Sequence, residues 1–78
     1  MGNEESKLIK AAEKGDLSTV QELVQNKVNI DCQDSEGFTP LHKAAAYNHL
    51  EVVKYLLRQG ANPNSFNKYE KKIKDYNN

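Results

Sequence analysis

Apolar residues recur along this chain at the spacing of short amphipathic helices, most clearly between residues 37 and 60. One set falls three and four positions apart, and a second set defines a wider apolar face a few residues later. The two sets are Leu41, Ala44 and Ala45, followed by Leu50, Val53, Leu56 and Leu57. This pattern predicts two short helices.

The ends of these helices carry recognisable signals. Thr39 is suited to cap a helix whose first residue is Pro40, where the missing N–H does no harm. The Asn48-His49 pair interrupts the pattern, and Gly60 suits the left-handed position that follows a helix. The segment is therefore interpreted as two antiparallel helices joined by a tight turn.

The same pattern occurs earlier in the chain. Each matched pair of positions is separated by the same number of residues as Leu8 and Leu41. The matched positions are Leu8 with Leu41, Ala11-Ala12 with Ala44-Ala45, Leu17 with Leu50, Val20 with Val53, Leu23 with Leu56, and Asn29 with Asn62. A fixed period of this length indicates a repeat architecture. The first copy predicts helices over residues 5–14 and 17–25.

The second copy resembles an ankyrin repeat. The resemblance rests on Thr39-Pro40-Leu41-His42 with Ala44-Ala45, on Leu50-Glu51-Val52-Val53 with Leu56-Leu57, and on Gly60-Ala61. It covers about residues 4–67. It implies an all-α repeat fold: an ankyrin-type stack of two antiparallel helix pairs with a β-hairpin finger between them. The implied domain is 1–67, with repeat one at about 4–33, repeat two at about 34–66 and a C-terminal tail at 68–78.

Several local features leave alternatives open. Gly2, with Ser6 four positions later, fits the N-myristoylation pattern, but the same residues also fit a helix start capped by Asn3 or Ser6. Either Asp16 or Ser18 can cap the next helix. Lys27 replaces an expected glycine, which is costly if its backbone is left-handed, unless Asn26 takes the left-handed position instead.

The segment between the helix pairs is polar and rich in turn residues. Residues 34–37 are interpreted as a turn that begins with Asp and ends with Gly. Ile30 is expected to point inward, and Cys32 is interpreted as a packed structural residue.

The repeat pattern fails after residue 67. Tyr69, Ile73 and Tyr76 are spaced as on one helix face, so the tail is interpreted either as a short helix that caps the stack or as a frayed end. The chain can also be a fragment of a longer array.

Composition limits the classes of function. The net charge is zero, which argues against a general nucleic-acid or membrane-surface binder. Residues 1–36 carry eight acids and four lysines, whereas residues 37–78 carry three acids and seven bases. This asymmetry fits either solvated helix faces or a dipolar surface that orients a partner. One cysteine excludes a disulfide scaffold and favours an intracellular, cytoplasmic setting, with the nucleus left open.

No pattern of catalytic or metal-binding residues stands out. His42 is expected to bond the backbone of the adjoining finger through a ring nitrogen, and the resemblance implies a similar role for His49 at the helix–helix turn. Neither histidine has a partner at metal-ligand spacing, and a Cys32–His42 pair lacks an orienting group. Two helix pairs are also expected to leave no pocket of ligand size. The sequence thus predicts no enzyme, no metal and no cofactor.

What remains is a surface for another protein. The resemblance implies binding through the finger and the exposed side of the first helix of each pair. Those positions are Ser35, Glu36 and Phe38 on the finger, Ala46 and Tyr47 on the second-repeat helix, and Glu13 and Lys14 on the first-repeat helix. Phe38 and Tyr47 are interpreted either as contact residues or as residues packed on their neighbours.

The expected function is therefore a protein–protein interaction module. The alternatives are a membrane-associated adaptor acylated at Gly2, or a truncated, minimal folding unit without its own partner. Membrane contact is expected only if Gly2 is acylated. Weak self-association through an uncovered end of the stack is a further expectation.

Overall fold

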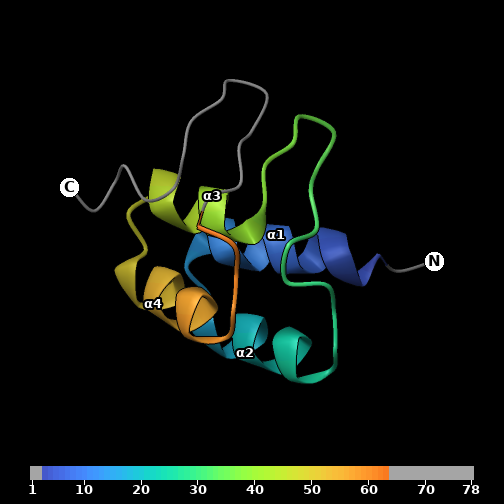
Figure 1. Ribbon diagram of the computed structural model, residues 1–78, viewed down its shortest axis with the longest axis horizontal. Helices are drawn as coiled ribbons and strands as arrows, with labels where there is room; N and C mark the ends of the chain where they lie inside the picture. The colour runs from blue at the N-terminus through green and yellow to red at the C-terminus, as the bar shows by residue number, and fades with distance from the viewer. Residues whose placement is uncertain (1–2, 64–78) are drawn as a thin grey trace.

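The computed structural model describes residues 3–63, and within them the chain forms two stacked helix pairs (Figure 1). The helices are α1 (Glu4–Lys14), α2 (Leu17–Gln25), α3 (Pro40–Ala46) and α4 (Leu50–Arg58). Helix α1 packs on α2 and α3 packs on α4, while α1 also lies against α3 and α2 against α4. The expected antiparallel pairs are therefore present, with boundaries within one residue of those predicted for the first copy.

Side-chain caps explain why three of the helices start where they do. The Asn3 side chain accepts hydrogen bonds from the backbone N–H groups of Glu5 and Ser6, at 3.0 and 3.2 Å. Asp16 accepts from the backbone N–H of Thr19 at 3.3 Å and from its hydroxyl at 2.7 Å. These bonds settle both open choices, because Asn3 caps α1 and Asp16 caps α2.

The Thr39-Pro40 start of α3 is confirmed and is more elaborate than the sequence indicated. The Thr39 hydroxyl accepts from the backbone N–H of His42 at 3.1 Å. In return, the Thr39 N–H donates to His42 Nδ1 at 2.9 Å, which completes a reciprocal capping box. The expected bond from a His42 ring nitrogen to loop backbone is thus present, and its partner is the last residue before the helix.

Left-handed backbone ends the helices at the positions where the pattern placed it. Gly15 has φ of 75° after α1, and Gly60 has φ of 97° after α4. After α2 the left-handed residue is Lys27, with φ of 70°, while Asn26 has φ of −84°. The strain that the sequence suggested for Lys27 is therefore real, because a Cβ atom disfavours this conformation.

The segment between α2 and α3 contains no strand within the described residues, so the expected β-hairpin finger is not confirmed. The segment doubles back through a turn: the Gly37 N–H donates to the Asp34 carbonyl at 3.0 Å, and the Asp34 N–H donates to the Phe38 carbonyl at 2.9 Å. A single hydrogen-bonded pair of residues across the loop, Asp34 with Phe38, is too short to form a β ladder. We call residues 33–38 the connecting loop.

The core lies where the four helices meet. Its fully buried large side chains include Leu8, Val20, Leu41, Val52 and Leu56. Cys32 is 3% exposed, and Ile30 is partly buried against the core, as expected. Leu50 belongs to the apolar face that the pattern predicted for α4, but it is 54% exposed, whereas Val52, outside that face, is buried.

The expected C-terminal cap falls on residues 68–78, which lie outside the described residues. None of the helices in residues 3–63 combines the length and the apolar character needed to cross a membrane.

Candidate functional site

An open groove runs between α1 and the connecting loop. Its volume is about 410 Å³, and its wall on the helix side consists of residues from one side of α1 and from its cap. The lining residues are Asn3, Glu5, Ser6, Ile9, Lys10 and Glu13, together with Gln33, Asp34, Ser35 and Lys43. The expectation that two helix pairs leave no pocket of ligand size was therefore wrong, because the loop forms a second wall.

Asp34 fixes the shape of the connecting loop. Its Oδ1 atom accepts from the backbone N–H groups of Glu36 and Phe38, both at 2.9 Å. Its Oδ2 atom lies 3.8 Å from Lys43 Nζ on α3, and both side chains are less than a third exposed. These bonds hold the tip of the loop in one conformation relative to α3.

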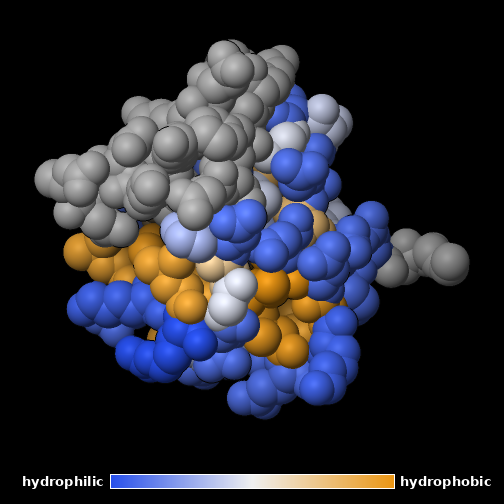
Figure 2. All heavy atoms as spheres, in the orientation of Figure 1, coloured by the Kyte–Doolittle hydropathy of each residue, from blue (hydrophilic) through white to orange (hydrophobic). Residues whose placement is uncertain are grey.

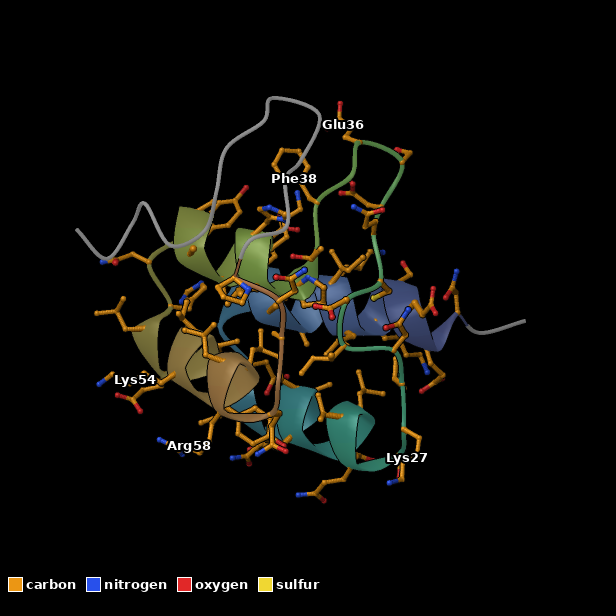
Figure 3. All side chains as sticks on the ribbon, viewed as in Figure 1. Lys27, Glu36, Phe38, Lys54 and Arg58 are labelled. Carbon is orange, nitrogen blue, oxygen red and sulfur yellow. The ribbon has the colours of Figure 1, made fainter. Side chains whose placement is uncertain are left out.

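The tip of this loop presents Ser35 and Glu36 to solvent. Both residues are exposed, and Figure 3 shows Glu36 at the outermost end of the loop, with Phe38 set further back. Gly37 has φ of 84°, which a glycine adopts without a steric penalty. The structure thus places two of the predicted contact residues on a rigid, accessible turn.

Phe38 is partly buried and packs within the protein. Its ring meets the His42 ring edge-on, with centroids 6.0 Å apart, and Lys43 Nζ lies 4.7 Å from its centroid. Aromatic and cation–π contacts of this kind stabilise a ring where it is. Of the two interpretations of Phe38, this geometry supports packing on its neighbours.

Ala46 and Tyr47 lie at the opposite end of α3 from the loop. Both are exposed, and Tyr47 is 54% exposed. The Tyr47 ring stacks on the His49 ring at a centroid distance of 6.5 Å and an angle of 24°. The tyrosine therefore presents one face to solvent while the other is supported.

His49 joins the two repeats. Its Nε2 atom lies 2.9 Å from the carbonyl oxygen of Glu13, to which it donates a hydrogen bond. The ring also lies so close to Gly15 that a Cβ atom there would be 2.5 Å from Nδ1. The structural role expected for this histidine at the helix–helix turn is confirmed.

The predicted contact residues do not form one site. Glu13 and Ser35 line the groove, and Glu36 lies beside it on the loop tip. Lys14 ends α1, away from the loop, and Tyr47 follows the end of α3. Gly2, the predicted acylation site, lies outside the described residues.

The sequence interpretation missed most of the groove. On α1 the missed residues are Glu5, Ser6, Ile9 and Lys10. The last three share one helical face with Glu13 at spacings of three and four. That spacing was a usable signal. On the loop side, Gln33, Asp34 and Lys43 carried no comparable signal, because only folding brings them opposite α1.

The buried Cys32 thiol is a weak nucleophile. Burial raises the pKa of the Cys32 thiol to about 11, so the thiolate needed for a nucleophile is scarce at neutral pH. Its Sγ atom lies 3.6 Å from the Glu5 carbonyl oxygen. Among residues 3–63 no three His, Cys, Asp or Glu side chains gather as metal ligands do.

Comparison with known proteins places this chain among repeat proteins. A family model described as "Ankyrin repeats (many copies)" matches residues 8–69. The mouse 2-5A-dependent ribonuclease is 41% identical over 61 residues, which cover 77% of this chain and 8% of that protein. Human ankyrin repeat domain-containing protein 49 is 44% identical over 55 residues, 69% of this chain and 23% of that protein.

A spider protein gives a third match of the same kind. Alpha-latrocrustotoxin-Lt1a of Latrodectus tredecimguttatus is 45% identical over 56 residues, 70% of this chain and 4% of that protein. The chain thus spans less than a quarter of the length of each of these relatives. The activities in their names belong to those whole proteins.

Proposed function

The chain belongs to the ankyrin-repeat family, and from that premise we propose that it binds a partner protein in the groove between α1 and the connecting loop. Ankyrin repeats are generally protein-interaction modules and typically have no catalytic activity. The fold alone does not name the partner. The proposal therefore rests on the surface that this chain presents.

The observation that supports the proposal is the groove itself, about 410 Å³ in volume and open to solvent. Its two walls are rigid, since one is a capped helix and the other is a loop tied down by Asp34. Preorganised walls lower the entropic cost of binding. Rigidity on both sides is what a recognition surface needs and what a simple solvated face lacks.

The lining indicates a polar partner segment that carries charges of both signs. Glu13 and Lys10 stand on the same face of α1, and neither forms an ion pair with another side chain among residues 3–63. Ile9, at 7% exposure, forms an apolar floor between them. A partner that pairs with these charges gains orientation and specificity more than affinity.

The proposal carries with it the expected intracellular, cytoplasmic setting, in which a free thiol such as Cys32 is stable. An acylated, membrane-associated form remains a separate prediction that rests on the sequence around Gly2.

Affinity capture followed by mass spectrometry tests the groove. The wild-type chain is compared with Glu13→Arg, which reverses a charge in the groove, and with Glu22→Arg, which makes the same change on the exposed surface of α2. The proposal expects proteins that are captured by the wild type and by Glu22→Arg but lost with Glu13→Arg. Equal capture by all three chains would show that the groove is not the binding surface.

A second pair of variants separates the groove from the aromatic residues. Phe38→Ala removes a ring that packs on His42 and Lys43, and Tyr47→Ala removes a ring at the far end of α3. If Tyr47→Ala alone abolishes capture while Glu13→Arg does not, the contact surface lies at the ends of the helices and the proposed site is wrong.

A further inference from the structure

Two carboxylates stand at opposite ends of the groove on α1. Glu5 lies in the first turn of the helix and Glu13 in its last turn, and both line the groove. Neither forms an ion pair with another side chain in the part of the chain that the structure describes. Their Cα atoms are about 12 Å apart along the helix axis, given a rise of ~1.5 Å per residue. Each carboxylate is therefore placed to meet a different residue of a bound segment.

An apolar residue lies midway between the two carboxylates. Glu5, Ile9 and Glu13 follow one another at intervals of four residues, so they form a single ridge along α1. Ile9 is only 7% exposed and lies low in the groove. We call these three residues the α1 row. The row thus presents an acid, an apolar residue and a second acid at steps of about 6 Å.

The other charges that line the groove do not cancel the charge of the α1 row. Asp34 and Lys43 pair with one another, with 3.8 Å between Oδ2 and Nζ. Lys10 is then the lining cation that has no acidic partner within residues 3–63, against the two carboxylates of Glu5 and Glu13. Figure 2 shows mostly hydrophilic side chains at the right edge, around the start of α1. The groove is negative on balance, which favours a positively charged segment.

The size of the groove favours an extended segment over a helix. A helix with its side chains is ~10–12 Å across, so a 12 Å length of it occupies roughly 900–1,400 Å³. This is more than twice the groove volume of about 410 Å³. An extended chain is thinner and turns every second side chain to the same side, at steps of ~6.6 Å. Its first, third and fifth side chains span about 13 Å, close to the length of the α1 row.

We propose that the groove binds an extended protein segment in which a basic, an apolar and a second basic residue occupy positions 1, 3 and 5. This inference rests on the proposed function and specifies the chemistry of the partner. The basic side chains pair with Glu5 and Glu13, and the apolar side chain covers Ile9. Lys10 lies beside the α1 row and pairs with an acidic residue of the partner outside these five positions.

Titration of the isotope-labelled full chain with synthetic peptides, followed by NMR, tests the spacing. The probe is an acetylated and amidated Gly-Lys-Thr-Val-Thr-Lys-Gly, whose threonines and valine favour an extended backbone. Gly-Lys-Lys-Thr-Val-Thr-Gly has the same composition with adjacent lysines, and Gly-Glu-Thr-Val-Thr-Glu-Gly has the opposite charge. The probe should bind with a dissociation constant on the order of 0.1–1 mM and shift amide signals of α1 and the connecting loop.

The two comparison peptides decide whether the spacing matters. The adjacent-lysine peptide should bind about two- to fivefold more weakly, the value of one exposed ion pair, and the glutamate peptide should not bind. Equal binding of the two lysine peptides would overturn the proposed spacing. A fourth peptide carries lysine, leucine and lysine at four-residue intervals among alanines, as on one face of a helix. If it binds more tightly than the probe, the occupant is a helix and the proposal is wrong.

Exchanging charges between chain and peptide locates the ion pairs. Glu13→Lys should weaken binding of the probe at least about threefold, and it should strengthen binding of a probe in which one lysine is replaced by glutamate. Glu22→Lys makes the same change on the exposed surface of α2 and should alter neither affinity. Glu5→Gln, at an exposed position, should weaken the probe about two- to fivefold. Equal effects of Glu13→Lys and Glu22→Lys would mean unspecific attraction and would contradict the proposal.

The peptide titration and the affinity capture fail in different ways. If Glu13→Arg loses captured proteins but the probe does not bind at about 5 mM, the partner has another chemistry. The inference is then wrong while the proposed function stands. If capture does not depend on Glu13, the proposed function fails, and the inference that rests on it fails as well.

Discussion

Replacing Gly15 with alanine tests the junction between the two repeats. Gly15 combines two constraints, because its φ is 75° and because an added Cβ would lie 2.5–2.8 Å from the His49 ring. A left-handed alanine costs about 1–2 kcal/mol. The His49 ring is held by its bond to the Glu13 carbonyl and by its stack on Tyr47, so it can yield only by breaking the bond. A lost hydrogen bond adds about 0.5–1.5 kcal/mol.

Gly15→Ala should therefore lower the free energy of unfolding by about 1.5–3.5 kcal/mol. Small domains have a total stability near the low end of ~5–15 kcal/mol, so this is a large fraction of the whole. Urea denaturation followed by far-ultraviolet circular dichroism at room temperature measures the change. The matched control is Gly60→Ala, where φ is 97° and no atom lies within 4 Å of the added Cβ.

A double-mutant cycle isolates the contribution of His49. In a His49→Ala background the clash is absent, so Gly15→Ala should cost only the backbone strain. The expected coupling between the two positions is about 0.5–1.5 kcal/mol, the value of the bond to Glu13. The reasoning fails if Gly15→Ala costs the same in both backgrounds, because the ring would then not be held against Gly15.

Three further predictions concern His42, Cys32 and Gly2. His42→Ala removes the ring that accepts a hydrogen bond from the Thr39 N–H, so it should lower the free energy of unfolding by about 1–2 kcal/mol. If elemental analysis finds one zinc ion per wild-type chain and none in His42→Ala, the purely structural role is contradicted. Burial raises the pKa of Cys32 from 9.0 to about 11, so iodoacetamide should modify the thiol slowly in the native chain at mildly alkaline pH and fast in urea; equal rates in both states would show that the thiol is accessible. The free energy of unfolding should also fall as the pH rises from 9.0 through about 11, because the thiol of the unfolded chain loses its proton first. If the N-terminal pattern is used, co-expression with an N-myristoyltransferase should add one acyl group, Gly2→Ala should abolish it, and membrane binding should be partial; an unchanged intact mass would end this prediction.

Local physics explains why the sequence predicted the helices. The caps at Thr39, the left-handed Gly15 and Gly60, and the apolar periods depend on residues within one or two turns of each other. The constant interval between matched positions, such as Leu8 and Leu41, then identified the repeat. Helix pairs that pack in the same way need apolar residues at the same positions. These features depend on no contact between the two repeats.

Contacts between distant residues decided the rest. The groove exists because folding places Ser35 opposite Glu13, and the His49 bond to Glu13 joins residues 36 positions apart. Leu17 and Leu50 occupy the same position in the repeat, yet one is packed and the other is exposed, since only the first has a neighbouring repeat within the described residues. The sequence determined which side chains form each repeat, but burial depends on what lies next to a repeat, and only the tertiary structure specified that.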